Sequence, residues 1–270
     1  WRQAVVLAHA VWRMGAILNP VTPIYREAEL QVIFDLANPR LVLCPASFGD
    51  VDYVTLTRKA LARPWVPIIP VDVDGPIWTT DAPADAVVHA DSATSGDVCV
   101  LMFTSGTTGT PKGVLHSHRT LLYEAWSIAQ RFSLSRPTVF MPSPLTHITG
   151  LLYGVLLPLL VDGRVVLQDR WNAARAVDLI EDEDCTFSVG ATPFLAGLVE
   201  EYAARGTSSA LTGFVCGGAD VPPSLMARAE SAMGTIAVRA YGLTELPTLT
   251  CGRPGDSLEV RGADDGALVG

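Results

Sequence analysis

Short apolar runs alternate with longer stretches of helical spacing along most of the chain. The run 98–104 (VCVLMFT) is apolar throughout, whereas 193–204 repeats its apolar residues every three or four positions. A continuous apolar run is typical of a strand buried on both faces, and the second spacing indicates a helix with one face on a core. The alternation therefore predicts βαβ units around a mainly parallel sheet.

The same reasoning assigns elements along the chain. Before residue 74 it predicts helices over 3–14, 26–36 and 53–61 and strands over 16–19, 41–44 and 66–71. After residue 97 it predicts strands over 98–104, 114–115, 138–141, 164–168, 186–189, 213–216 and 236–240. Helices are expected over 117–130, 148–160, 174–181, 193–204 and 223–233.

A stretch without periodicity divides these elements. Residues 74–96 are rich in Pro, Asp, Ala, Ser and Thr, which is typical of a surface connection. We therefore expect a partial first α/β subdomain over 1–96 and a second α/β subdomain over 97–251. Residues 252–270 carry turn residues and are expected to hold no complete element, only the start of a following region. The chain is interpreted as part of a longer protein.

Composition narrows the class of protein. The 270 residues include 19 Lys and Arg against 28 Asp and Glu, a net charge of −9, which argues against a nucleic-acid binder. With 49% hydrophobic and 17% charged residues, the chain is too apolar for disorder. The most apolar run, 151–161, is shorter than the roughly 20 residues of a membrane span. Five scattered cysteines, without a Cys-x-x-Cys pair, favour reduced thiols in a cytoplasmic protein.

The loop TSGTTGTPKG at 104–113 carries the sharpest chemical signal. Its glycines let backbone N–H groups approach a ligand closely, its hydroxyls add donors, and Lys112 adds a positive charge. These are the components of a phosphate cradle at a strand's carboxyl end, where ligands bind in open α/β sheets. A flexible linker has the same composition, but it has no reason to join two apolar strands. A Walker loop is excluded because Pro111 precedes and Gly113 follows the lysine.

Three motifs together carry a family resemblance. TSGTTGTPKGV resembles the phosphate loop of the adenylate-forming superfamily, which includes acyl-CoA synthetases, peptide-synthetase adenylation domains and luciferases. The turn 217–220 (GGAD) is similar to that family's Gly-Gly-Ala turn beside the adenine, and 241–245 (YGLTE) resembles its Tyr-Gly-x-Thr-Glu motif. The resemblance implies two stacked, mainly parallel sheets flanked by helices, as in that family's large N-terminal domain, here incomplete.

The resemblance also implies roles for single residues. Lys112, Thr244 and Glu245 would be catalytic, with Thr244 donating to the α-phosphate of ATP and Glu245 helping to hold Mg²⁺. The expected nucleotide-binding residues are Thr104, Ser105, Gly106, Thr107, Thr108, Gly109, Lys112, Gly217, Gly218, Ala219, Tyr241, Gly242 and Thr244. Simpler interpretations stay open: Glu245 as a surface acid, Tyr241 as core packing, and Asp220 as turn chemistry.

The acid substrate is indicated by a fourth segment. Residues 144–150 (PLTHITG) are similar to the Pro-Leu-x-His-x-x-Gly pattern of acyl-CoA synthetases, in which the histidine, here His147, flanks the acyl pocket. No acidic residue occurs in 140–160, where peptide-synthetase domains tend to place an Asp, so an acid without an α-amino group is favoured. Thr192 and Gly218 are further candidates for this pocket. A buried structural histidine remains the alternative for His147.

The implied activity is an ATP-dependent ligation. A small-molecule carboxylic acid would be converted to an acyl-adenylate with release of pyrophosphate, and the full-length parent would then form a thioester with CoA. The family's small C-terminal domain, with its catalytic lysine, is expected outside this chain. A domain that loads a carrier protein and a non-catalytic nucleotide-binding fragment are the alternatives.

Overall fold

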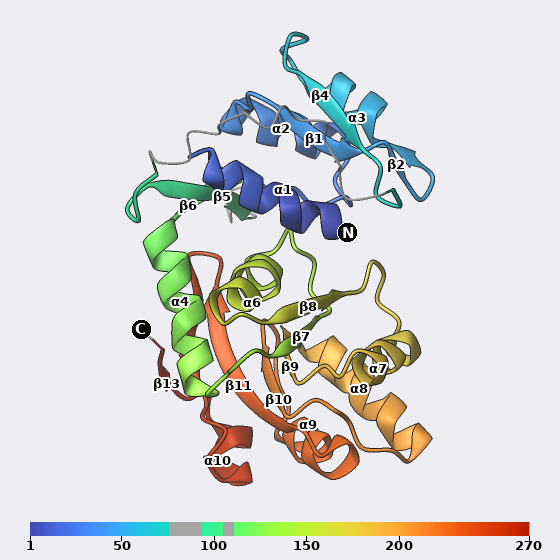
Figure 1. Cartoon of the computed structure of the whole chain (residues 1–270), viewed down its shortest axis with the longest axis vertical. Helices are drawn as coiled ribbons and strands as arrows, with labels where there is room; N and C mark the ends of the chain where they lie inside the picture. Colours follow the sequence, from blue (N-terminus) through green and yellow to red (C-terminus); the bar gives the residue numbers. More distant parts are fainter. Residues whose placement is uncertain (76–92, 105–110, 270) are drawn as a thin grey trace. The chain divides into compact units, whose positions relative to one another are not determined.

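The chain folds into two compact units. The computed structural model describes residues 1–75, 93–104 and 111–269 (Figure 1). The units comprise Trp1–Ser117 and His118–Gly270. The division therefore falls later than the expected boundary after residue 96, and the predicted strand 98–104 belongs to the first unit.

Three helices and six short strands form the first unit among its described residues. The helices are α1 (Arg2–Arg13), α2 (Glu27–Ala37) and α3 (Tyr53–Ala60). Parallel β1 (Val42–Pro45) and β4 (Ile68–Val71) form one pair, and antiparallel β2 (Ser47–Phe48) and β3 (Val51–Asp52) form another. The third pair, β5 (Val98–Thr104) and β6 (Lys112–Ser117), is antiparallel. The second large sheet expected from the resemblance is thus represented by two-stranded pieces.

Hydrogen bonds hold β5 against the start of the chain. Leu18 N–H donates to the Cys99 carbonyl, and Leu101 N–H donates to the Leu18 carbonyl, both at 2.9 Å. The buried Trp12 indole also donates to the Cys99 carbonyl at 3.0 Å. These contacts explain why β5 packs with the first unit. The predicted strand 16–19 is reduced to a single bridge between Leu18 and Val100.

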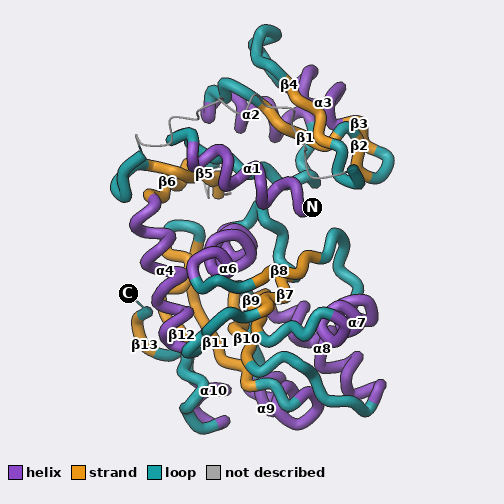
Figure 2. Tube along the Cα trace, viewed as in Figure 1, coloured by secondary structure: helices purple, strands orange, loops and turns teal. Residues whose placement is uncertain are grey.

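A seven-stranded sheet forms the centre of the second unit. Its order is β13-β12-β11-β10-β9-β7-β8 (Figure 2). Five neighbouring strands are parallel: β7 (Thr138–Met141), β8 (Arg164–Leu167), β9 (Phe187–Ala191), β10 (Gly213–Gly217) and β11 (Ile236–Leu243). The two strands β12 (Leu246–Cys251) and β13 (Ala267–Leu268) continue the sheet in antiparallel fashion. The predicted α/β class is confirmed.

Helices cover both faces of this sheet. One face carries α7 (Ala173–Asp182), α8 (Thr192–Arg205), α9 (Pro223–Arg228) and the π-helical turn η2 (Ala229–Met233). The other carries α4 (His118–Arg131), α5 (Ile148–Leu151), the π-helical turn η1 (Leu152–Leu156) and α6 (Leu157–Leu160) (Figure 1). The first face buries a continuous apolar core that includes Phe140, Leu198 and Phe214. Each such side chain contributes about 1.5–3 kcal/mol on full burial.

Proline explains one irregularity on the second face. A single helix was predicted over 148–160, but the structure interrupts it with the π-helical turn η1. Pro158 has no N–H to donate to the carbonyl four residues earlier, and its ring crowds that carbonyl. The chain therefore widens by one residue locally, and such π-turns often occur at functional sites.

The tail is more ordered than the sequence suggested. The expectation that 252–270 holds no complete element is wrong, because it contains α10 (Leu258–Ala263) and β13. Ser257 caps α10 by accepting from Val260 N–H at 3.3 Å. Strand β12 was also missed, because LPTLTC mixes polar residues into a short run.

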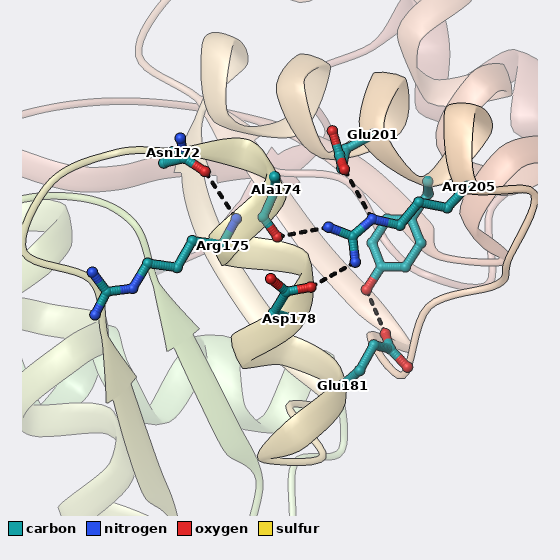
Figure 3. A network of polar contacts seen from close by, with 8 residues as sticks. Asn172, Ala174, Arg175, Asp178, Glu181, Glu201 and Arg205 are labelled. Carbon is teal, nitrogen blue, oxygen red and sulfur yellow. Dashed lines mark hydrogen bonds and ion pairs between the residues drawn. The ribbon is translucent and has the colours of Figure 1, made fainter.

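A polar network braces α7 against α8. In Figure 3, dashed lines join Arg205 to Asp178 and to Glu201. These two bonds measure 2.6 Å and 2.8 Å, and the Tyr202 hydroxyl donates to Glu181. Arg205 lies in the last turn of α8, where a cation also compensates the helix dipole. The network fixes the direction of α8, whose first residue, Thr192, follows β9.

Membrane insertion finds no support in the helices. Among those in the described ranges, none combines the length and the apolar character needed to cross a bilayer.

Candidate functional site

Parallel strands bring several of the predicted residues to one edge of the second unit's sheet. Strands β7, β9, β10 and β11 run in the same direction, so their carboxyl ends lie at the same edge. His147 follows β7, Thr192 follows β9, the 217–220 turn closes β10, and 241–245 closes β11. This edge is where ligands bind in open α/β sheets.

The turn after β10 depends on glycine. Gly218 has φ +79°, a left-handed conformation that other residues adopt only with strain. Gly218, Ala219 and Asp220 are all exposed beyond the end of the strand. The Thr192 hydroxyl donates to the Asp220 carbonyl at 3.0 Å, so the predicted substrate residue Thr192 and this turn are in direct contact. Asp220 therefore contributes its backbone to the turn.

A hairpin between β11 and β12 presents the next motif. Leu243 pairs with Leu246, so Thr244 and Glu245 form a two-residue turn. The Tyr241 side chain is 51% exposed, which contradicts the core-packing interpretation and leaves its ring available for stacking. The Glu245 side chain is exposed as well.

The segment after β7 places His147 at the start of a helix. His147 is the N-cap of α5, with extended backbone, and its N–H donates to the Pro144 carbonyl at 3.0 Å. Its side chain is exposed. The alternative of a buried structural histidine is therefore wrong. The exposed imidazole can contact a ligand at the sheet edge.

The phosphate-loop residues belong to the first unit. Thr104 ends β5 and pairs with Lys112, which begins β6 with an exposed side chain. Lys112 therefore lies on a strand and not at a helix start, in keeping with the exclusion of a Walker loop. The expectation that this loop follows a strand of a parallel sheet is wrong, since β5 pairs with antiparallel β6. Ser105, Gly106, Thr107, Thr108 and Gly109 lie outside the described residues.

A buried polar cluster behind the hairpin was missed by sequence reasoning. The Tyr153 hydroxyl, in η1, hydrogen-bonds the Thr248 hydroxyl, in β12. Burial raises the pKa of Glu124, in α4, and hydrogen bonds from Thr248 oppose that rise only in part. Burial, together with the nearby Glu124, raises the pKa of Tyr153 well above its usual value. The three residues are far apart in sequence and match no motif, so only the fold shows them together.

Among the described residues, neither a cage of metal ligands nor an exposed thiol is present. Within the described ranges, no three His, Cys, Asp or Glu side chains gather as a metal cage. The single exposed carboxylate of Glu245 fits Mg²⁺, which typically takes one or two carboxylates plus substrate phosphates. All five cysteines are free and buried, and burial raises the pKa of Cys216 to about 11 and of Cys251 to about 12. Such thiols stay protonated and are poor nucleophiles.

Comparisons with known proteins agree with these motifs. A family model described as AMP-binding enzyme matches residues 1–266. The medium-chain fatty-acid–CoA ligase of Escherichia coli K12 is 31% identical over 91% of this chain and 45% of its own length. A Mycobacterium tuberculosis CoA ligase for 3-[(3aS,4S,7aS)-7a-methyl-1,5-dioxo-octahydro-1H-inden-4-yl]propanoate is 31% identical over 98% of this chain and 57% of its own.

A solved structure supports the fold independently. The ATP-bound MatB of Rhodopseudomonas palustris superposes with a TM-score of 0.80 at 23% identity, over 98% of this chain and 52% of that one. The chain spans about half the length of the curated relatives that it matches.

Proposed function

The chain belongs to the AMP-binding enzyme family, and from this membership we propose that the protein carrying it is an AMP-forming acid–CoA ligase. It would use ATP to convert a carboxylic acid to an acyl-adenylate, release pyrophosphate, and then form the CoA thioester. The observation that carries the proposal is the shared sheet edge of Thr192, the 217–220 turn and the 241–245 hairpin.

The first step makes specific demands on the protein. A carboxylate oxygen attacks the α-phosphorus of ATP, the bond to the β-phosphate oxygen breaks, and pyrophosphate leaves. Because negative charge spreads over the phosphoryl oxygens, positioning and charge stabilisation supply most of the catalysis. Hydroxyl donors and a lysine meet these demands, because they can position the phosphates and stabilise the negative charge on them.

Each residue then takes one role. Lys112, exposed at the start of β6, would bind the β- and γ-phosphates with Thr104 and the 105–109 loop. Thr244 would donate to the α-phosphate, and Glu245 would hold Mg²⁺, which when bound neutralises phosphate charge. Tyr241, half exposed beside this turn, would stack on the adenine, with Gly217, Gly218, Ala219 and Gly242 leaving room for the nucleotide.

The acid would be apolar and without an α-amino group. Residues 140–160 contain no carboxylate to pair with an ammonium group, and η1 and α6 are built almost entirely of apolar side chains. His147 and Thr192 would border the acyl group. Both curated relatives reported above are named as CoA ligases, which favours CoA over a carrier protein as the acceptor.

Pyrophosphate exchange tests the proposal. The whole protein that carries this chain is incubated with ATP, labelled pyrophosphate and a panel of fatty, alicyclic and aromatic acids. We expect acid-dependent exchange, reduced about 100-fold by Lys112→Ala, the scale of losing one electrostatic donor. Lys59→Ala is the matched control, because Lys59 is the other lysine of the chain and is exposed on α3. Absence of exchange with every acid would refute the proposal.

A further inference from the structure

The 244–245 turn is not of the type that best matches the twist of its strands. Two-residue hairpin loops favour turn types with positive φ, because only these match the twist of the flanking strands. Thr244 and Glu245 are not among the described non-glycine residues with positive φ. A turn of the remaining types splays its strands, so another feature must set where Thr244 and Glu245 point.

A bulge in β12 provides that feature. Tyr241 pairs with Thr250 and Leu243 pairs with Leu246, so one residue of β11, Gly242, faces three residues of β12. Gly242 makes this possible, because a Cβ at its position would lie 2.0 Å from the Pro247 carbonyl oxygen. Bulges re-aim side chains and occur next to active sites. Here the bulge determines how the strands enter the turn.

Thr248, at the middle of the bulge, is held from inside the unit. Its side chain is only 5% exposed and its hydroxyl bonds the hydroxyl of Tyr153, which is 1% exposed. Glu124, in α4, lies near enough to Thr248 that the Thr248 hydroxyl and backbone N–H lower the pKa of its carboxyl, against the larger effect of burial. Either hydroxyl of the Tyr153–Thr248 pair can be the donor. A buried hydrogen bond between two hydroxyls therefore joins η1 to β12, and Glu124 of α4 lies near it.

The side chains of Tyr153 and Glu124, which lie beside Thr248, are both restricted in position. Tyr153 sits in the π-helical turn, whose widened backbone places its ring in the core. The Oε1 atom of Glu124 is buried, and the described residues offer it no hydrogen-bond partner. Buried polar groups of this kind are held strongly in one arrangement, because any other arrangement leaves them unpaired.

We propose that Tyr153 and Thr248 are positioning residues, which pin the β12 bulge and so aim Thr244 and Glu245. The inference rests on the proposed function, since it assigns these residues to the phosphate contacts of that reaction. The proposed function assigns neither residue a contact with the nucleotide. They act through the register of the hairpin.

Hydroxyl-deleting variants of the whole protein test this. Thr248→Val and Tyr153→Phe keep the shape of each side chain but remove one hydroxyl, and Thr248→Ser restores it. Thr250→Val is the matched control: Thr250 lies on the same strand, and the described residues give its hydroxyl no hydrogen bond. The readouts are kcat and KM for ATP in pyrophosphate exchange well below the melting temperature, and amide hydrogen exchange of residues 243–248.

The expected result separates positioning from mere stability. Thr248→Val and Tyr153→Phe should lower kcat at least tenfold with KM for ATP changed less than threefold, and should speed amide exchange in 243–248. Thr248→Ser and Thr250→Val should stay within twofold of wild type in every readout. Wild-type rates in the first two variants, with only a lower melting temperature, would overturn the inference. If the wild type shows no pyrophosphate exchange with any acid, the proposed function fails. The inference is then overturned separately if amide hydrogen exchange in 243–248 is the same in Thr248→Val and Tyr153→Phe as in the wild type.

Discussion

Replacing Arg261 with methionine should destabilise the second unit strongly. Arg261 lies in α10, in the tail segment, and is 4% exposed. Its guanidinium donates to the Glu230 carboxylate at 2.5 Å, to the Ala237 carbonyl at 2.9 Å and to the Asp256 carbonyl at 3.1 Å. Methionine keeps most of the side-chain length and removes all three bonds.

The loss of stability depends on whether each acceptor can find another hydrogen-bond partner after the substitution. The Glu230 side chain is 47% exposed, so water can replace the lost partner at little cost. Ala237 is fully buried in β11, and β12 pairs with that strand only from Ala240 onward. The substitution therefore leaves the buried Ala237 carbonyl without this hydrogen bond, which costs about 1–3 kcal/mol of stability. Loss of the other hydrogen bonds from the charged guanidinium adds a similar amount. We expect a loss of about 3 kcal/mol in the free energy of unfolding.

Urea unfolding followed by far-ultraviolet circular dichroism measures this loss. Arg253→Met is the control, because Arg253 is exposed in the same segment and, among the described residues, its side chain has no hydrogen-bond partner. A loss of about 3 kcal/mol corresponds to a melting temperature lower by about 6–12 °C for a unit of this size. If Arg261→Met unfolds within 0.5 kcal/mol of wild type, the desolvation of the arginine cancels its bonds and the reasoning is refuted.

Two further variants test the hairpin and its support. Burial raises the pKa of Glu124 in the folded state above its usual value of 4.5. The stability that comes from its neutral form is therefore fully present below pH 4.5 and is lost as the pH rises through the pKa of the folded state. Glu124→Gln is neutral throughout, so the unfolding free energy of the variant relative to wild type should rise between pH 4 and pH 8; a constant difference would contradict this. Gly242→Ala should cost about 2 kcal/mol by forcing a Cβ to 2.0 Å from the Pro247 oxygen. Thermal unfolding should leave Gly255→Ala, whose Cβ would meet nothing within 4 Å, close to wild type.

The elements of the second unit were largely predictable because its core is periodic. Strand 138–141 was located to the residue, and 223–233 was found as one helical stretch that the structure divides into α9 and η2. The tail was not predictable, because its ordering depends on the buried contacts of Arg261. An arginine among Gly and Asp residues looks like a solvated turn until the carbonyl that it bonds is known.

The pairing of β5 failed for a different reason. Its apolar run suits a buried strand of either direction, and only the following turn decides its partner. The short connection to β6 brings Lys112 directly opposite Thr104, which a parallel neighbour could not do. The two strands that flank the motif were therefore predicted correctly, while the sheet around them was not.

The candidate site divides in the same way into what a sequence can and cannot show. His147, which follows β7, and Tyr241 and Glu245, at the end of β11, are exposed, and each belongs to a short local motif. Thr248 and Tyr153 are constrained by each other, across 95 residues of chain. A mutual constraint of this kind leaves no local pattern, because many other buried pairs could hold the same bulge. Exposed residues of a local motif can therefore be found from spacing, whereas a buried pair such as Thr248 and Tyr153 becomes visible only when the fold brings it together.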